Sequence, residues 1–331
     1  MKLTKPSYFD SFRCIAGICP DSCCKEWDVL VDPDKAAFYR ALPGDLGERL
    51  RQVLKDEDGD TYMMIENRRC PMWRQDGLCR IQAELGEGAL CKTCREFPRL
   101  AHDYGSFVEM GLELSCPEAA RIIFESGWTQ YLSEDIPGGE APAYDVEAMQ
   151  ILLRSRETMR QLLADKSRNV GETLAVALMY GYHIQAELDG AEVSFFDPES
   201  ALEEARHFAR TGDMAAVLDY FRNLEILTES WSARLAHPES SPWSDGHRTL
   251  ADYFVNRYWL QAVSDYDLVS RVKLTVISCL VVKALGGNII STAQMYSKEI
   301  ENSIENLEAI LDGAYSAPAF TDDRLFGLLL L

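Results

Sequence analysis

Hydrophobic and polar positions follow two different patterns along the chain, and the change comes near Pro117. Before this residue, apolar residues form short runs separated by Gly and Pro, which predicts an irregular region with a few short elements. After it, apolar residues recur every three or four positions over long stretches, which is the period of amphipathic helices. The pattern therefore predicts a mainly α protein, in which an irregular N-terminal part precedes an all-α helical bundle.

The N-terminal part is expected to hold short strands and short helices. Asp32 can cap a helix that begins at Pro33, because proline suits the first helical turn. The segment 106–112 alternates apolar and polar residues, as a half-buried strand does. The other expected elements are strands at 27–31 and 62–65, helices at 45–55 and 81–85, and a turn at 58–60.

The helical part is expected to begin with Pro117 at the first position of a helix that continues over 118–126. A loop at 137–142, rich in Pro and Gly, is the best candidate for a boundary. We therefore predict two domains, 1–136 and 137–331. The other expected helices cover 144–165, 170–188, 213–235, 247–264, 266–285 and 292–311.

The N-terminal residues Met1 to Pro6 are not followed by an apolar stretch of the kind that a secretory signal requires. The longest apolar run, 276–285, is interrupted by Lys283 and is too short to cross a bilayer. We therefore expect a soluble, cytoplasmic protein without membrane association.

The formal net charge of −20 is spread unevenly. Residues 1–116 carry 16 Lys and Arg against 20 Asp and Glu, whereas residues 117–331 carry 17 against 33. The segment 68–99 is a basic island, with seven basic and four acidic residues. Such an acidic chain is a poor partner for nucleic acid, whose phosphates it would repel, and it suits a cationic partner such as a lysine-bearing protein surface better.

The cysteines carry the strongest chemical signal of the chain. Nine of the ten lie within the first 116 residues. Thiolates bind soft metals, and in a reducing cytosol such a density of cysteines indicates metal or redox chemistry more than disulfides. Cys279, on an apolar helix face, is expected to be a small buried hydrophobe. The nine clustered residues are Cys14, Cys19, Cys23, Cys24, Cys70, Cys79, Cys91, Cys94 and Cys116.

Two of these cysteines, Cys70 and Cys116, each precede a proline. A proline removes one backbone donor and can begin a helix, whose amides can then donate hydrogen bonds to a negatively charged sulfur. We therefore predict that a helix begins after each Cys-Pro pair. Cys91 and Cys94 form a Cys-x2-Cys chelate that is followed by Arg95 and Arg99.

The order of these motifs resembles a known family. Cys-x3-Cys-Cys, Cys-Pro-x7-Cys-x-Ile, Cys-Arg-x-Phe-Pro and Cys-Pro resemble the cysteine-cluster proteins that are described as zinc- or iron-chelating. The longer segment 92–99, Lys-Thr-Cys-Arg-Glu-Phe-Pro-Arg, together with a helical tail, resembles the bacterial flagellin lysine-N-methylases. The motifs cover residues 8–121, and over the tail only length and general character agree.

The resemblance implies a metal site at matching positions and a [4Fe–4S] cluster as cofactor. Such a cluster usually takes four thiolates, and nine cysteines are available. Either a second metal site exists, or several cysteines contact the metal ligands without binding the metal themselves. Cys91 and Cys14 fall outside the pattern shared with the shorter family, and of these two only Cys91 is included as a candidate ligand. The candidate ligands are Cys19, Cys23, Cys24, Cys70, Cys79, Cys91, Cys94 and Cys116.

The resemblance also implies methyl transfer from S-adenosylmethionine to lysine side chains of flagellin or a similar protein. The Cys-x3-Cys-x2-Cys signature of radical enzymes is absent, because Glu26 occupies the third position. No Gly-x-Gly-x-x-Gly turn follows a strand either. One hypothesis is that Arg95 or Arg99 binds the methionine carboxylate of the donor. The sequence selects no catalytic residue.

Two other functions remain open from the sequence. The chain could be a non-catalytic zinc- or iron-binding protein whose helical domain binds a partner. It could also be a redox protein in which Cys91 and Cys94 exchange a disulfide.

Overall fold

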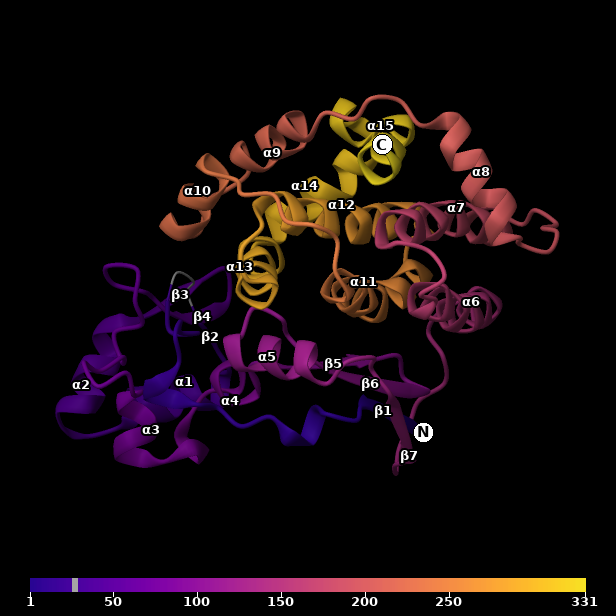
Figure 1. Cartoon of the computed structure of the whole chain (residues 1–331). Helices are drawn as coiled ribbons and strands as arrows, with labels where there is room; N and C mark the ends of the chain where they lie inside the picture. Colours follow the sequence, from indigo (N-terminus) through magenta and orange to yellow (C-terminus); the bar gives the residue numbers. More distant parts are fainter. Residues whose placement is uncertain (26–28) are drawn as a thin grey trace.

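The structure of the chain is a computed structural model that describes residues 1–25 and 29–331. Helices make up most of these residues, and the strands lie in the N-terminal part (Figure 1). The mainly α fold with a few short strands is therefore confirmed. Trp27 and Asp28, which belong to the strand predicted at 27–31, lie outside the described residues, and the remainder of that strand is β2, Val29–Val31.

A four-stranded sheet lies below the helical part, with strand order β5-β6-β1-β7 (Figure 1). β1 (Lys2–Pro6) pairs in parallel with β6 (Phe107–Leu112) and antiparallel with β7 (Tyr131–Asp135). β5 (Arg99–Asp103) pairs antiparallel with β6, which confirms the strand predicted at 106–112. The chain continues from β6 into helix α5 (Pro117–Glu125), so the sheet fixes where that helix begins.

A second, smaller sheet has the order β2-β4-β3 and belongs to the cysteine-rich lobe, which we define as residues 14–96. β3 (Leu54–Glu57) and β4 (Asp60–Met63) form a hairpin. The strand predicted at 62–65 corresponds to β4, which begins and ends two residues earlier than predicted. Gly59, with φ +92°, confirms the predicted turn. The helices of this lobe are α1 (Pro33–Ala41), α2 (Gly44–Val53), α3 (Arg80–Leu85) and α4 (Lys92–Glu96).

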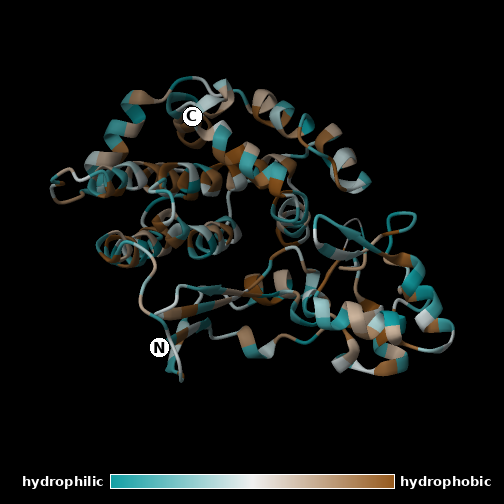
Figure 2. Ribbon diagram, turned by 180° about the vertical axis from the view of Figure 1, so that it is seen from behind, coloured by the Kyte–Doolittle hydropathy of each residue, from teal (hydrophilic) through white to brown (hydrophobic). Residues whose placement is uncertain are grey.

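The helices that follow the sheets stack above them, and α12 lies among them and is buried along almost its whole length (Figures 1 and 2). They are α6 (Val146–Ala164), α7 (Val170–Leu188), α8 (Pro198–Phe208), α9 (Met214–Arg222), α10 (Glu229–Ala236), α11 (Asp245–Tyr258), α12 (Val269–Leu285), α13 (Ile289–Glu301), α14 (Ile304–Ser316) and α15 (Asp322–Leu330). Short 3-10 helices lie at Phe9–Ser11, Ala16–Ile18, Glu87–Ala89, Trp259–Val263 and Pro318–Phe320. Among the described residues, none of the helices combines the length and the apolar character that a bilayer crossing requires.

Two of the predicted helices were wrong as single elements. The helix predicted at 213–235 is divided into α9 and α10, because Thr228 caps a new helix by accepting from the amide of Trp231 at 3.1 Å. The helix predicted at 292–311 is divided into α13 and α14, because Ser303 accepts from the amide of Asn306 at 3.2 Å. A side-chain oxygen at these positions satisfies amides that a continuous helix would use internally.

The apolar side chains form two separate cores. One lies inside the cysteine-rich lobe and joins residues between Val29 and Cys91. The other joins the helical part to α5 and to Phe9 and Phe12 near the N-terminus. The helix α5 therefore connects the end of the cysteine motifs to the helical core. The predicted division at residue 136 stays a prediction.

His247 is a buried histidine in the first turn of α11, and its side chain is 1 % exposed. Its Nδ1 accepts a hydrogen bond from the backbone amide of Ser244 at 3.1 Å, which requires an unprotonated Nδ1. Burial, together with the positive charge of Lys283, lowers the pKa of His247 to about 4.

We expect this histidine to make the fold sensitive to acid. The unfolded chain takes up its proton near pH 6.5 and the folded chain only near pH 4, so the contribution to stability is complete above pH 6.5 and is lost as the pH falls towards 4. The loss in the free energy of unfolding is about 3 kcal/mol, measured by urea unfolding across this range. His247→Gln keeps an acceptor at this position but cannot titrate, and its stability should vary less between these pH values. An equal pH dependence in the variant would contradict the assignment.

Candidate metal centre

Three of the clustered cysteines stand at helix N-caps: Cys79 before α3, Cys91 before α4 and Cys116 before α5. The helix predicted after Cys116 and its proline is therefore confirmed. The helix predicted after Cys70 is wrong, because the chain turns there and the amide of Trp73 donates to the carbonyl of Cys70 at 2.9 Å. This turn directs the chain back towards the cysteine loop, where the amide of Cys70 donates to the carbonyl of Cys24 at 2.8 Å.

Cys24 lies at the centre of the cysteines, since the thiols of both Cys23 and Cys70 lie close enough to shift its pKa. These contacts lower the pKa of Cys24, and the same contacts together with burial raise the pKa values of Cys23 and Cys70. The charge of Cys24 also raises the pKa values of Cys79 and Cys94, which places these thiols near it.

The thiols of Cys91 and Cys94 lie close to each other at the first turn of α4. Their contact lowers the pKa of Cys91 to about 7 and raises that of Cys94. The charge of Cys91 also raises the pKa of Cys79. An inner group is therefore formed by Cys24, Cys70, Cys79, Cys91 and Cys94.

An outer group is formed by Cys14, Cys19, Cys23 and Cys116. Burial, together with the charges of Cys19 and Cys14, raises the pKa of Cys116 to about 11. The amides of Ala119 and Glu118 at the start of α5 oppose this effect by donating to the sulfur. The charges of Cys14 and Cys116, as well as that of the neighbouring Cys24, raise the pKa of Cys23. Cys23 therefore connects the outer group to the inner group.

The chemistry of these donors fits a soft metal or an iron–sulfur cluster. No disulfide joins the cysteines of the described residues, so the thiols remain available as ligands. Within residues 1–25 and 29–331, no three side chains of His, Cys, Asp or Glu are grouped so that they could hold a metal ion as they stand. The ligands would therefore have to move together on binding. Metal binding by these cysteines stays a prediction.

The cysteine loop is held by polar contacts that the sequence did not reveal. Asp21, between Cys19 and Cys23, accepts from Lys298 of α13 at 2.9 Å and from Lys25 at 3.0 Å. Gln294, also of α13, donates to the carbonyl of Ser115 at 2.7 Å, directly before Cys116. These contacts join two cysteine motifs to one helix that is far away in the sequence. No pattern in the chain marks Gln294 or Lys298 as different from other helical residues.

Asp32 holds another part of the site in place. It stands before α1 as predicted, but its side chain does not cap that helix. Instead, its carboxylate accepts from the amide of Lys92 at 2.6 Å, in the first turn of α4. The prediction that Asp32 caps its own helix was therefore wrong. The contact fixes the turn that carries Cys91 and Cys94.

The two arginines proposed for donor binding, Arg95 and Arg99, contact different residues. Arg95 is half-exposed on α4 and lies 3.8 Å from the carboxylate of Glu96. The guanidinium of Arg99 lies over the ring of Phe12, 5.1 Å from its centre. A role of Arg95 or Arg99 in binding the donor stays a prediction. Cys279 is fully buried in α12, as expected, among the residues of the helical core.

The chain is similar to three known Salmonella proteins. It is 32% identical over 139 residues to a lysine-N-methylase of Salmonella typhimurium and to one of Salmonella choleraesuis, which covers 40% of this chain and 35% of each relative. It is also 32% identical over 139 residues to the flagellar biosynthetic protein FliU of Salmonella muenchen, of which 82% is covered. The chain thus spans about a third of the length of the two lysine-N-methylases. No family model and no solved structure matches the chain.

Proposed function

Because this chain belongs to the family of FliU and the lysine-N-methylases of Salmonella, we propose that it methylates lysine side chains of flagellin or of a similar protein. S-adenosylmethionine is the proposed methyl donor. An iron–sulfur cluster of the [4Fe–4S] type, bound by the clustered cysteines, is the proposed cofactor. The observation that supports this best is the convergence on Cys24 of thiols that come from four separate motifs of the chain.

The cysteines would hold the cluster through four of the nine thiolates of the N-terminal part. The inner group supplies five candidates that interact with one another: Cys24, Cys70, Cys79, Cys91 and Cys94. The outer group would then supply ligands for a second site or support the first through contacts with its ligands. When bound, an iron–sulfur cluster supplies redox chemistry and an electrophilic iron.

The proposed reaction breaks the bond between sulfur and methyl carbon in the donor and forms a bond between the lysine nitrogen and that carbon. The lysine must be deprotonated before it can attack, so one proton leaves the ε-ammonium group. Removal of water lowers the pKa of a lysine and favours this neutral form. The strongly acidic helical part, with 17 basic and 33 acidic residues over 117–331, supports docking of a protein surface that is rich in lysine.

The proposed function predicts methyl transfer by protein that was purified without oxygen. With S-adenosylmethionine that carries a labelled methyl group, flagellin should gain label on its lysine residues, which mass spectrometry locates. Flagellin whose lysines were acetylated beforehand serves as the control and should gain none. Protein that contains zinc, with no iron and no transfer, would instead support the non-catalytic metal-binding alternative. A disulfide between Cys91 and Cys94 that exchanges with added thiols would support the redox alternative.

A further inference from the structure

A cavity of about 550 Å³ lies between the cysteine-rich lobe and the helical part. On one side it is lined by Pro20, Asp21 and Lys25 of the cysteine loop. Pro117 and Arg121 of α5 continue the same wall. Cavities of a few hundred cubic ångströms are typical binding sites for small molecules, so this one is large enough for a ligand of the size of a nucleoside with an attached amino acid.

The opposite wall is helical and mostly polar. Thr228 and Ser230 line it at the start of α10, and the remaining lining residues belong to α13 and its N-cap: Asn288, Ile290, Ser291, Gln294, Met295 and Lys298. Lys298 and Thr228 are buried, 6 % and 5 % exposed. Hydroxyl, amide and ammonium groups therefore line a space that is partly open to solvent, since the side chain of Arg121 on the other wall is 48 % exposed.

The cavity is distinguished from others by its position beside the cysteines. Asp21 and Lys25 alternate with Cys19, Cys23 and Cys24 along the loop, and Pro117 directly follows Cys116. Two other cavities formed by the described residues, one lined by Tyr104 and Tyr144 and one by Tyr8 and Tyr131, have no lining residue next to a cysteine. Of these three cavities, this one alone has lining residues that are sequence neighbours of the cysteines.

The charges of the cavity suit a ligand that carries both signs. Lys25, Lys298 and Arg121 supply three cations, and Asp21 supplies one carboxylate. Asp21 binds both lysines, at 3.0 and 2.9 Å, and Arg121 binds two carboxylates of α5 outside the cavity. The lining itself thus holds more cations than carboxylates, although each cation already has a carboxylate partner. It would attract a carboxylate, while Asp21 could accept from an ammonium group.

We propose that this cavity binds a molecule with an α-amino acid group and that, on the basis of the proposed function, this molecule is S-adenosylmethionine. Arg121 and Lys25 bind its carboxylate and Asp21 accepts from its amino group. Thr228 and Ser230 offer hydroxyl groups to the nucleoside. Since Asp21 belongs to the cysteine loop, this wall of the cavity is complete only when the loop is folded.

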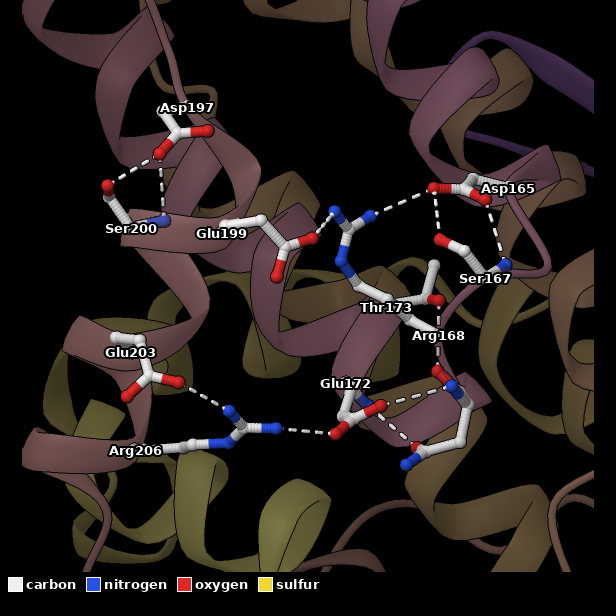
Figure 3. Close-up of polar contacts among 11 residues, drawn as sticks. Asp165, Ser167, Arg168, Glu172, Thr173, Asp197, Glu199, Ser200, Glu203 and Arg206 are labelled. Carbon is white, nitrogen blue, oxygen red and sulfur yellow. Dashed lines mark hydrogen bonds and ion pairs between the residues drawn. The ribbon is translucent and has the colours of Figure 1, made fainter.

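The proposal is tested by binding of S-adenosylhomocysteine, the demethylated product, to full-length protein prepared without oxygen, using isothermal titration calorimetry. Arg121→Gln removes one cation from the cavity, and Ser230→Trp fills the space without a change in charge. Each should weaken binding about tenfold or more. Arg206→Gln is the matched control: Arg206 is 45% exposed against 48% for Arg121, and it also bridges two carboxylates, Glu172 and Glu203 (Figure 3). It should bind like the wild type.

The outcomes separate this inference from the proposed function. If both Arg121→Gln and Ser230→Trp bound S-adenosylhomocysteine with wild-type affinity and had unchanged unfolding temperatures, the cavity would not be the donor site. The proposed methyl transfer would not be affected by that result. If Arg95→Leu lowered the affinity while both cavity variants kept it, the donor would bind at Arg95 instead. If the wild-type protein bound neither S-adenosylmethionine nor S-adenosylhomocysteine, the proposed donor would be wrong, and the assignment of the cavity with it.

Discussion

Replacing Cys24 with serine is expected to lower the iron content of protein prepared without oxygen roughly tenfold or more. The thiol of Cys24 lies close to those of Cys23 and Cys70, and its charge raises the pKa values of Cys79 and Cys94. A serine hydroxyl keeps the shape of the side chain but is a hard, weakly acidic ligand, whereas iron–sulfur clusters are held by soft thiolates. Iron per chain and the broad absorption near 400 nm, typical of iron–sulfur proteins, measure the effect.

The control for this variant is Cys279→Ala, which removes a thiol from the other end of the chain. Cys279 is fully buried and packs among the apolar residues of α12, so its loss should cost about 1 kcal/mol of stability and no iron. Circular dichroism shows whether each variant keeps its helices. Wild-type iron content in Cys24→Ser would show that this thiol is not a ligand, and a wild type loaded with zinc would contradict the iron–sulfur cluster.

The sequence predicted those parts of the fold that depend on nearby residues. The helices α7 and α12 begin and end close to the expected positions because their apolar residues keep a helical period without interruption. The breaks at Thr228 and Ser303 were missed, since serine and threonine also occur inside helices. At Thr228, the segment between α9 and α10 is held by contacts with distant residues, because Asn306 and Glu299 accept from the amides of Glu225 and Leu227.

The pairings that assemble the site could not be predicted from one sequence. β1 pairs with β6 and β7, more than a hundred residues away, and short strands without strong alternation leave such partners undefined. The contact between Asp21 and Lys298 spans 277 residues. The sequence did predict which thiols would be candidate ligands, because their residue type and spacing carry that information. It could not predict that they divide into an inner group and an outer group.

The second large effect is expected at Glu301, whose side chain is fully buried at the end of α13. Its carboxylate accepts from Arg257 at 2.7 Å, from Tyr253 at 3.0 Å and from Tyr258 at 2.8 Å. Glu301→Leu would leave the buried guanidinium of Arg257 without its counter-charge and two tyrosine hydroxyls without their acceptor. We expect the free energy of unfolding, measured by urea titration, to fall by roughly 3–5 kcal/mol.

Two further variants test whether charge is the cause. Glu301→Gln keeps an acceptor for the tyrosines and should lose less stability than Glu301→Leu. The double variant with Arg257→Leu removes both charges and should recover part of the loss, because an apolar pair in place of a buried ion pair leaves no uncompensated charge. Glu308→Leu, at an exposed position of α14, is the matched control and should change stability by less than about 0.5 kcal/mol. The opposite outcome is additivity, in which the stability lost by the double variant equals the sum of the losses in Glu301→Leu and Arg257→Leu. The two residues would then act independently, and the buried ion pair would not be what joins α11 to α13.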